Sequence, residues 1–176
     1  TNKTKEIDNI LINPHSKDYF FNSLRLIAEN FCLSQTNKKI KVVRISNLYG
    51  DFFKNQKYFL PNLIRNSIKK KSIHITINKN SKKNYLNVND AIQIIFKIIN
   101  KGKYRLYNVA SNQRYSLDFI SSTIQKITKC KIKFSNQKYR YDEPIINIKR
   151  VKKEFKFKPK NDFKEKLQYI IKEFNI

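Results

Sequence analysis

Short β-branched segments alternate along this chain with longer segments whose apolar residues recur at helical spacing. The run Ile-Lys-Val-Val-Arg-Ile over 40–45 has the composition of a buried parallel strand. A helical pattern over 59–70 follows, with Pro61 in its opening turn, where proline is tolerated. Such alternation predicts an α/β fold with at least part of a parallel sheet.

The same reading extends to both ends of the chain. Asp18 and Ser116 precede two of the expected helices as caps, and Gly102 ends another. We expect the segment 46–56 to be a loop. The further helices are expected over 18–35, 89–102, 116–128, 146–157 and 162–174, and the further strands over 73–77, 85–88, 104–110 and 131–134. In the first helix, one apolar face is expected to hold Leu24, Ile27, Ala28 and Phe31.

Composition limits the classes of protein. A chain of 176 residues with 40% hydrophobic residues can bury one sizeable core. No apolar run has the length of a membrane span, and no signal-peptide pattern opens the sequence. Cys32 and Cys130 lack metal-ligand spacing, and His15 and His74 stand apart from other ligand types. We predict free thiols in a reducing cytoplasm, no metal site and no membrane span.

The charge raises the alternative of nucleic-acid binding. Lys and Arg number 38 against 13 acidic residues, which gives a formal net charge of +25. The lysines are spread over every segment, and no helix-turn-helix or zinc-finger spacing accompanies them. Lys, Asn and Ile, whose codons are A/T-rich, are abundant together. We therefore prefer compositional drift, with a basic nucleic-acid-associated module as the third hypothesis.

Glycine is nearly absent. Gly50 and Gly102 are the only two glycines, so this chain cannot build a glycine-rich loop whose backbone amides approach a phosphate.

Seven segments, each ordinary by itself, follow one another in a characteristic order. They are "LIAEN", "VVRISNLYG", "FLPNLIR", "KKNYLNVNDA", "YNVAS", "SLDFI" and "INIKRVKKEFKFKPK". This order and spacing closely resemble the C-terminal two-thirds of the NAD-dependent epimerase/dehydratase family, the extended short-chain dehydrogenases that modify nucleotide sugars. The resemblance covers residues 13–174.

The resemblance implies an architecture. It implies the C-terminal part of a Rossmann-type sheet with a small α/β substrate-binding lobe, in a longer protein whose N-terminal half carries the dinucleotide loop. The segments 18–48 and 88–110 would belong to the dinucleotide-binding sheet, and 49–87 with 111–176 to the substrate lobe. This chain alone is expected to be inactive, and to expose an apolar patch where further strands would pair.

The resemblance also implies catalytic positions. The family has a Tyr-x-x-x-Lys pair on the helix that corresponds to 18–35, with Glu29 as the anchor of the alignment. Phe21 takes the Tyr position and Arg25 the Lys position, so the acid/base hydroxyl is missing while the positive charge is kept. Tyr19 is the alternative hydroxyl, but it lies about 200° around the helix from Phe21.

Further roles are carried over in the same way. Arg25, Ser46 and Leu48 would contact the cofactor, NAD or NADP. The residues that would contact the nucleotide sugar are Asn47, Tyr58, Lys83, Tyr85 and Arg140.

The leading hypothesis is a nucleotide-sugar epimerase or dehydratase, an isomerase or lyase in surface-polysaccharide precursor synthesis. The resemblance does not choose among epimerase, dehydratase and reductase. The second hypothesis is a non-catalytic nucleotide-sugar-binding relative, as Phe21 suggests. The family further implies a cytoplasmic protein and a homodimer through the 18–35 helix.

Overall fold

The computed structural model describes residues 4–16, 18–50, 57–135, 140–160 and 162–174. Its helices are α1 (Tyr19–Ser34), α2 (Phe59–Lys69), α3 (Val88–Lys101), α4 (Leu117–Thr128), α5 (Lys149–Phe155) and α6 (Phe163–Phe174). Its strands are β1 (Val42–Ile45), β2 (Asn47–Tyr49), β3 (Ser72–Ile75), β4 (Lys82–Asn87), β5 (Leu106–Val109), β6 (Arg114–Ser116) and β7 (Lys131–Phe134). The predicted alternation of strands and helices is confirmed.

The strands form three small sheets that are parallel for the most part. β1 pairs with β5, β2 with β4, and β3 with β7, each in parallel, while β4 also pairs antiparallel with β6. Two parallel strands that pair need a crossover connection, and at least one helix lies between the two strands of each parallel pair. The fold is therefore the expected α/β arrangement with parallel sheets.

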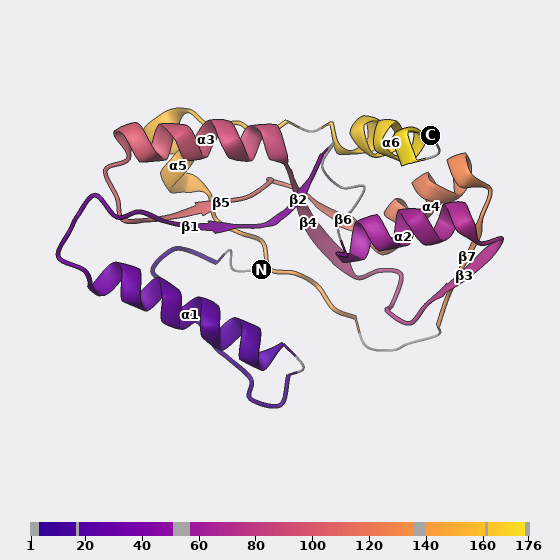
Figure 1. Cartoon of the computed structure of the whole chain (residues 1–176), viewed down its shortest axis with the longest axis horizontal. Coiled ribbons are helices and arrows are strands. Elements are labelled where there is room, and N and C mark those ends of the chain that lie inside the picture. The colour runs from indigo at the N-terminus through magenta and orange to yellow at the C-terminus, as the bar shows by residue number, and fades with distance from the viewer. Residues whose placement is uncertain (1–3, 17, 51–56, 136–139, 161, 175–176) are drawn as a thin grey trace.

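One hydrophobic core lies on the β1/β5 sheet, and we call it the first core. Helices α3 and α5 contribute Ile94, Ile98 and Val151 to it, and β5 contributes Tyr107 and Val109. In Figure 1, α3 and α1 lie on opposite sides of the β1/β5 ribbon. Since the core residues come from the α3 side, α1 lies outside this core.

A second hydrophobic core joins α2, α4 and α6 with the remaining strands, and we call it the second core. At its centre Phe163 stacks on Tyr115 at 4.2 Å and on Tyr85 at 5.2 Å between ring centroids. Tyr49 meets the same ring edge-on at 5.0 Å. In Figure 1 the elements of the first core, α3, α5, β1 and β5, lie beside those of the second core, α2, α4 and α6, along the length of the molecule. The end of β1, where the chain passes to β2, lies between them.

Helix α1 departs from its prediction in two ways. It forms over nearly the expected residues, but none of its residues is buried, and the predicted apolar face of Leu24, Ile27 and Phe31 is exposed. Asp18 precedes the helix without a side-chain capping hydrogen bond, so the predicted cap is wrong. Its backbone, at φ −94° and ψ 8°, is not in the extended conformation that a capping side chain requires.

Two short strands were not predicted, whereas the helix cap at Ser116 was. Within the expected loop 46–56, Asn47–Tyr49 forms β2, because β4 offers it a parallel partner; 51–56 lie outside the described residues. The three-residue strand β6 was not predicted, since so short a segment shows no measurable alternation. The cap at Ser116 is confirmed by its hydrogen bond from the Phe119 N–H.

Candidate functional site

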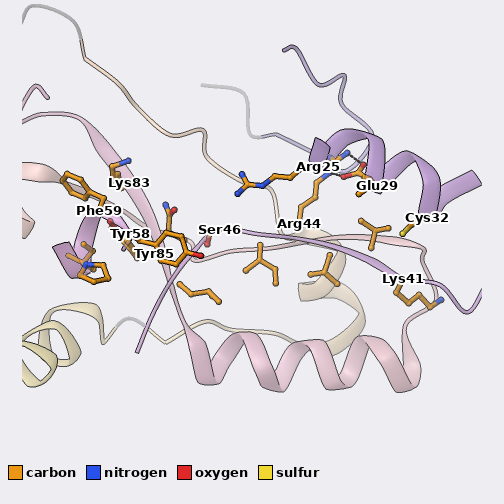
Figure 2. A pocket seen from close by; sticks show the side chains of 18 residues that line it. Arg25, Glu29, Cys32, Lys41, Arg44, Ser46, Tyr58, Phe59, Lys83 and Tyr85 are labelled. Atoms are coloured by element: carbon orange, nitrogen blue, oxygen red, sulfur yellow. Dashed lines mark hydrogen bonds and ion pairs between the residues drawn. The ribbon is translucent and has the colours of Figure 1, made fainter. Parts of the chain in front are cut away.

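A cavity of about 1000 Å³ opens beside β1. Figure 2 shows its lining, which comes from α1, from β1 and the turn after it, from the start of α2 and from β4. Among the described residues, β1 pairs only with β5. The cavity therefore has a strand with one free edge along one side and a helix with no buried residue along another.

The turn after β1 carries the chain from one sheet to the next. The Ser46 N–H donates to the Val109 carbonyl at 3.1 Å and closes the β1/β5 ladder, and Asn47 then pairs with Tyr85 in the next sheet. Ligands in open α/β sheets bind beyond the carboxyl ends of the strands, where neighbouring connections diverge. Ser46 and Asn47 line the cavity at such a position.

Polar contacts, rather than apolar packing, hold α1 beside β1. Arg44 donates to both carboxylate oxygens of Glu29, from Nε at 2.8 Å and from Nη2 at 2.5 Å. The hydrogen bond to Glu29 raises the pKa of Arg44. Arg105 donates to the carbonyls of Cys32 and Leu33 at the end of the helix. Both contacts place α1 without burying its apolar face.

A cluster of hydrogen-bond donors, two of which belong to the cavity-lining residues Asn47 and Lys83, converges on one carboxylate. Glu143 accepts from Asn47 Nδ2 at 2.9 and 3.0 Å, from the Asn84 backbone N–H at 2.7 Å, and from Lys83 Nζ at 3.2 Å. Arg114 also donates to the Glu143 carbonyl at 2.6 Å, which anchors this segment through its backbone. Cationic and amide donors around a single carboxylate form an anion-binding arrangement.

Aromatic rings surround the same cluster. The Lys83 ammonium lies 5.5 Å from the ring centroids of both Phe59 and Tyr141. Tyr85 lines the cavity but is only 4% exposed. Burial, followed by the nearby charge of Glu143, raises the pKa of Tyr85.

Most of the residues predicted for the site line this one cavity. They are Arg25, Ser46, Asn47, Leu48, Tyr58, Lys83 and Tyr85. Phe21 and Tyr19 do not line it, and their side chains are 63% and 43% exposed near the start of α1. Arg140 also lies outside the lining, and it pairs with Asp142, whose pKa it lowers through hydrogen bonding.

Sequence reasoning missed Glu143 and the partnership of Arg44 with Glu29. Glu143 lies 59 positions from Asn84, so only the fold brings the carboxylate to the donor cluster. Arg44 lies in an apolar strand, and its charge there was a usable signal, because a charged residue on a half-buried strand requires a partner.

Among the residues that the structure describes, no three His, Cys, Asp or Glu side chains gather where a metal ion could bind. The described helices also include none long and apolar enough to cross a membrane.

The fold and the cavity together define an α/β protein with a cavity at the carboxyl end of a parallel strand. Residues 23–110 match the family model described as the NAD dependent epimerase/dehydratase family. The matched segment makes up half of the sequence, so the chain belongs to this NAD dependent epimerase/dehydratase family. No curated protein sequence matches the chain significantly.

Solved structures share the fold at low identity. The dTDP-glucose 4,6-dehydratase from Bacillus anthracis, in complex with NAD, is 21% identical with a TM-score of 0.76, and the match covers 98% of this chain and 55% of that one. RMD from Pseudomonas aeruginosa, complexed with NADPH, is 15% identical with a TM-score of 0.73, covering 98% and 64%.

A third structure is UDP-N-acetylglucosamine 4-epimerase from Methanobrevibacter ruminantium, in complex with UDP-N-acetylmuramic acid. It is 19% identical with a TM-score of 0.75, and the match covers 97% of this chain and 56% of that one. The chain thus spans between about half and two-thirds of the length of these three structures.

The described residues fit one part of a dinucleotide. Ser46 Oγ is buried without a hydrogen-bond partner in the cavity wall, and Arg25 lines the same wall. A buried hydroxyl without a partner can exchange a hydrogen bond with a ligand group such as a ribose hydroxyl or an amide. The backbone-amide loop that grips a pyrophosphate needs several glycines, which this chain lacks. The described residues therefore offer polar groups to a ligand in the cavity but no backbone loop for a pyrophosphate.

Proposed function

We propose that this chain supplies the nucleotide-sugar-binding part of an NAD(P)-dependent epimerase or dehydratase. One observation carries the proposal: seven residues assigned to cofactor or substrate from the family resemblance line a single cavity at the carboxyl end of β1. They come from four separate segments of the sequence, around 25, 46–48, 58 and 83–85.

In this proposal the cavity has a cofactor end and a substrate end. Arg25, Ser46 and Leu48 contact the nicotinamide ribose region, which agrees with the free hydroxyl of Ser46. The substrate end is formed by Asn47, Tyr58, Lys83 and Tyr85. The solved relatives that carry NAD, NADPH or a UDP-sugar support this choice of ligands.

The β1/β5 sheet would then belong to the dinucleotide-binding side, and the second core to the substrate lobe. When bound, the nicotinamide supplies hydride transfer. The residues of this chain would bind and orient the sugar. Arg25 would place a positive charge beside the reacting hydroxyl, which favours its deprotonated form. Phe21 has no proton to exchange, so the acid/base step lacks its usual group.

The exposed position of Phe21 favours a second candidate function, a relative that binds a nucleotide sugar without turning it over. Phe21 lies edge-on to Phe20 at 6.2 Å and does not line the cavity. Tyr19, the alternative hydroxyl, also lies outside the lining. Both positions would have to move for α1 to contribute an acid or base.

The broader setting belongs to the same proposal. A role in surface-polysaccharide precursor synthesis and a cytoplasmic location go with nucleotide-sugar chemistry, and the unpaired Cys32 and Cys130 agree with a reducing compartment. A homodimer through α1 would cover the exposed Leu24, Ile27 and Phe31.

Two measurements test the proposal. Isothermal titration of this chain with UDP-glucose should show saturable binding that Asn47→Ala weakens. The protein that carries this chain together with a dinucleotide-binding half should convert at least one member of a nucleotide-sugar panel to an epimer or a dehydrated product, detected by NMR, if it is an enzyme. Phe21→Tyr should raise that rate if Phe21 occupies the acid/base position.

The outcomes separate the two candidates. UDP-glucose binding without conversion of any panel member to product, unchanged by Phe21→Tyr, supports the non-catalytic relative. Absence of binding to every nucleotide sugar in the panel would overturn both candidates.

A further inference from the structure

The donor cluster at the substrate end of the cavity already holds an anion that belongs to the protein. We propose that the Glu143 carboxylate excludes phosphate from this cluster, and that Glu143 is thereby a specificity-determining residue of the cavity. The part of this inference that says which group of a nucleotide sugar Asn47 contacts rests on the proposed function. Phosphate exclusion itself can be tested without it.

The first step concerns the geometry of the donors. Asn47 Nδ2, the Asn84 N–H and Lys83 Nζ all lie between 2.7 and 3.2 Å from Glu143 oxygens. Such a combination of amide N–H groups and an ammonium suits a phosphate equally well. The Glu143 side chain is 19% exposed and the Lys83 side chain 15%, so the contact is largely shielded from water.

The second step concerns the orientation of the Asn47 amide. Its Nδ2 lies 3.0 Å from the Asn84 carbonyl and 2.9 to 3.0 Å from the two Glu143 oxygens. Both neighbours can only accept hydrogen bonds, so the amide must turn its NH₂ group towards them. Both of its N–H groups are then occupied. The group that Asn47 can offer to a ligand is its carbonyl oxygen, which accepts.

The third step concerns charge. A phosphate that approached these donors would have to displace Glu143 or lie beside it. Lying beside it brings two like charges together in a partly dehydrated site, which is unfavourable. Displacing it exchanges one set of charge-assisted hydrogen bonds for another with little gain. A neutral ligand hydroxyl meets neither obstacle and can donate to Asn47 Oδ1.

We therefore expect a sugar hydroxyl, rather than the diphosphate, to contact Asn47 while Glu143 is in place. Lys83 donates to Glu143 at 3.2 Å, so the carboxylate offsets the positive charge that would attract a phosphate. Binding of the diphosphate at this cluster requires Glu143 to leave.

The test uses inorganic phosphate and amide NMR spectra of this chain. In the wild-type protein, the Asn84 backbone amide and the Asn47 side-chain amide should show no saturable shift. In Glu143→Ala the freed donors should bind phosphate saturably, with an affinity at least about tenfold higher. Glu143→Gln, which keeps the shape and removes the charge, should show a smaller gain in the same direction.

Asp142→Asn is the matched control. It removes the same single charge from the neighbouring residue, but that carboxylate contacts Arg140 and the Lys82 N–H instead of the cluster. It should leave phosphate binding at Asn84 unchanged. If Asp142→Asn and Glu143→Gln increased the affinity for phosphate equally, the increase would come from the change in net charge alone. That result would overturn the proposal.

The wild-type titration decides the question even if the Glu143 variants fail to fold, which circular dichroism would reveal. A saturable phosphate shift at Asn84 in the wild-type chain would overturn the proposal, and its absence supports it. Failure of the proposed function looks different, since it means that UDP-glucose does not bind while phosphate exclusion still holds.

Discussion

Helices α1 and α4 are both amphipathic, yet they relate to the rest of the molecule in opposite ways. α4 has 12 residues and buries five of them, among them Ile120 and Ile124 in the second core. α1 has 16 residues and buries none. The longer helix therefore has no fully buried side chain, and it is linked to the sheet by the Glu29–Arg44 ion pair and by the hydrogen bonds from Arg105.

The difference shows what amphipathicity determines. Apolar residues at helical spacing make a helix with an apolar face, but the face is buried only where another element lies against it. In α4 the elements that cover the face lie within this chain. In α1 the face of Leu24, Ile27 and Phe31 has no cover among the described residues, while charged contacts on the other side still fix the helix.

The largest expected difference between the second core and the exposed face of α1 is in the cost of removing an aromatic ring. Phe163→Ala removes a ring that contacts three tyrosines and is 1% exposed. It should lower the free energy of unfolding by about 3 to 5 kcal/mol, measured by urea denaturation. Phe31→Ala on α1, where the ring is 67% exposed, is the matched control and should change it by less than about 0.5 kcal/mol. An equal loss in both would mean that the α1 face is buried in solution.

A second test concerns the end of α3, which packs in the first core. Gly102 has an ordinary φ of −65°, but an added Cβ would lie 2.5 Å from the Ile98 carbonyl oxygen. Gly102→Ala should therefore cost about 1 to 3 kcal/mol of unfolding free energy, because the backbone must shift. Lys101→Ala, at the exposed preceding position, should be nearly neutral. Equal stability of both variants would show that this helix end is loosely packed.

A third test addresses the polar attachment of α1. Glu29→Gln removes the charge that holds Arg44, so α1 amides should exchange hydrogen faster, with local protection lowered by about 1 to 2 kcal/mol. The α4 amides should keep their protection. Arg140→Gln, which breaks an exposed ion pair, should alter neither helix. Loss of protection in α4 as well would mean that the two helices unfold as one unit.

The smallest effect is a loss of stability at alkaline pH. It should come from Tyr107, which lies in the first core. Burial, together with the hydrogen bond to Glu154, raises the pKa of Tyr107 to about 12, against about 10 in the unfolded chain. The folded state then holds its proton more tightly, so stability falls as pH rises from about 10 to 12. Urea midpoints measured against pH should fall more steeply for the wild type than for Tyr107→Phe. Identical slopes would contradict the assignment.

Much of the fold followed from local pattern. The helices over α2, α3, α4 and α6 were predicted because apolar spacing and turn signals agree there, and Ser116 caps its helix as expected. The short strands β2 and β6 were missed since three residues carry no periodic signal. β2 exists because β4 offers it a partner, which is a tertiary property.

The site divides in the same way. Seven residues placed by family resemblance lie together on one cavity wall. The resemblance says which residue types to expect at which position, but not what contacts they make. Glu143 shows this limit, since its contact with Asn47 spans 96 positions of sequence and changes which group of that amide a ligand can reach.

The sequence by itself determined the α/β alternation, the absence of a glycine-rich phosphate loop and the phenylalanine at position 21, because each depends only on residue type and spacing. The tertiary structure alone decided that the apolar face of α1 stays exposed and that Glu143 occupies the donors of the cavity. Burial and charge pairing depend on which distant segments meet, and local spacing carries no record of that.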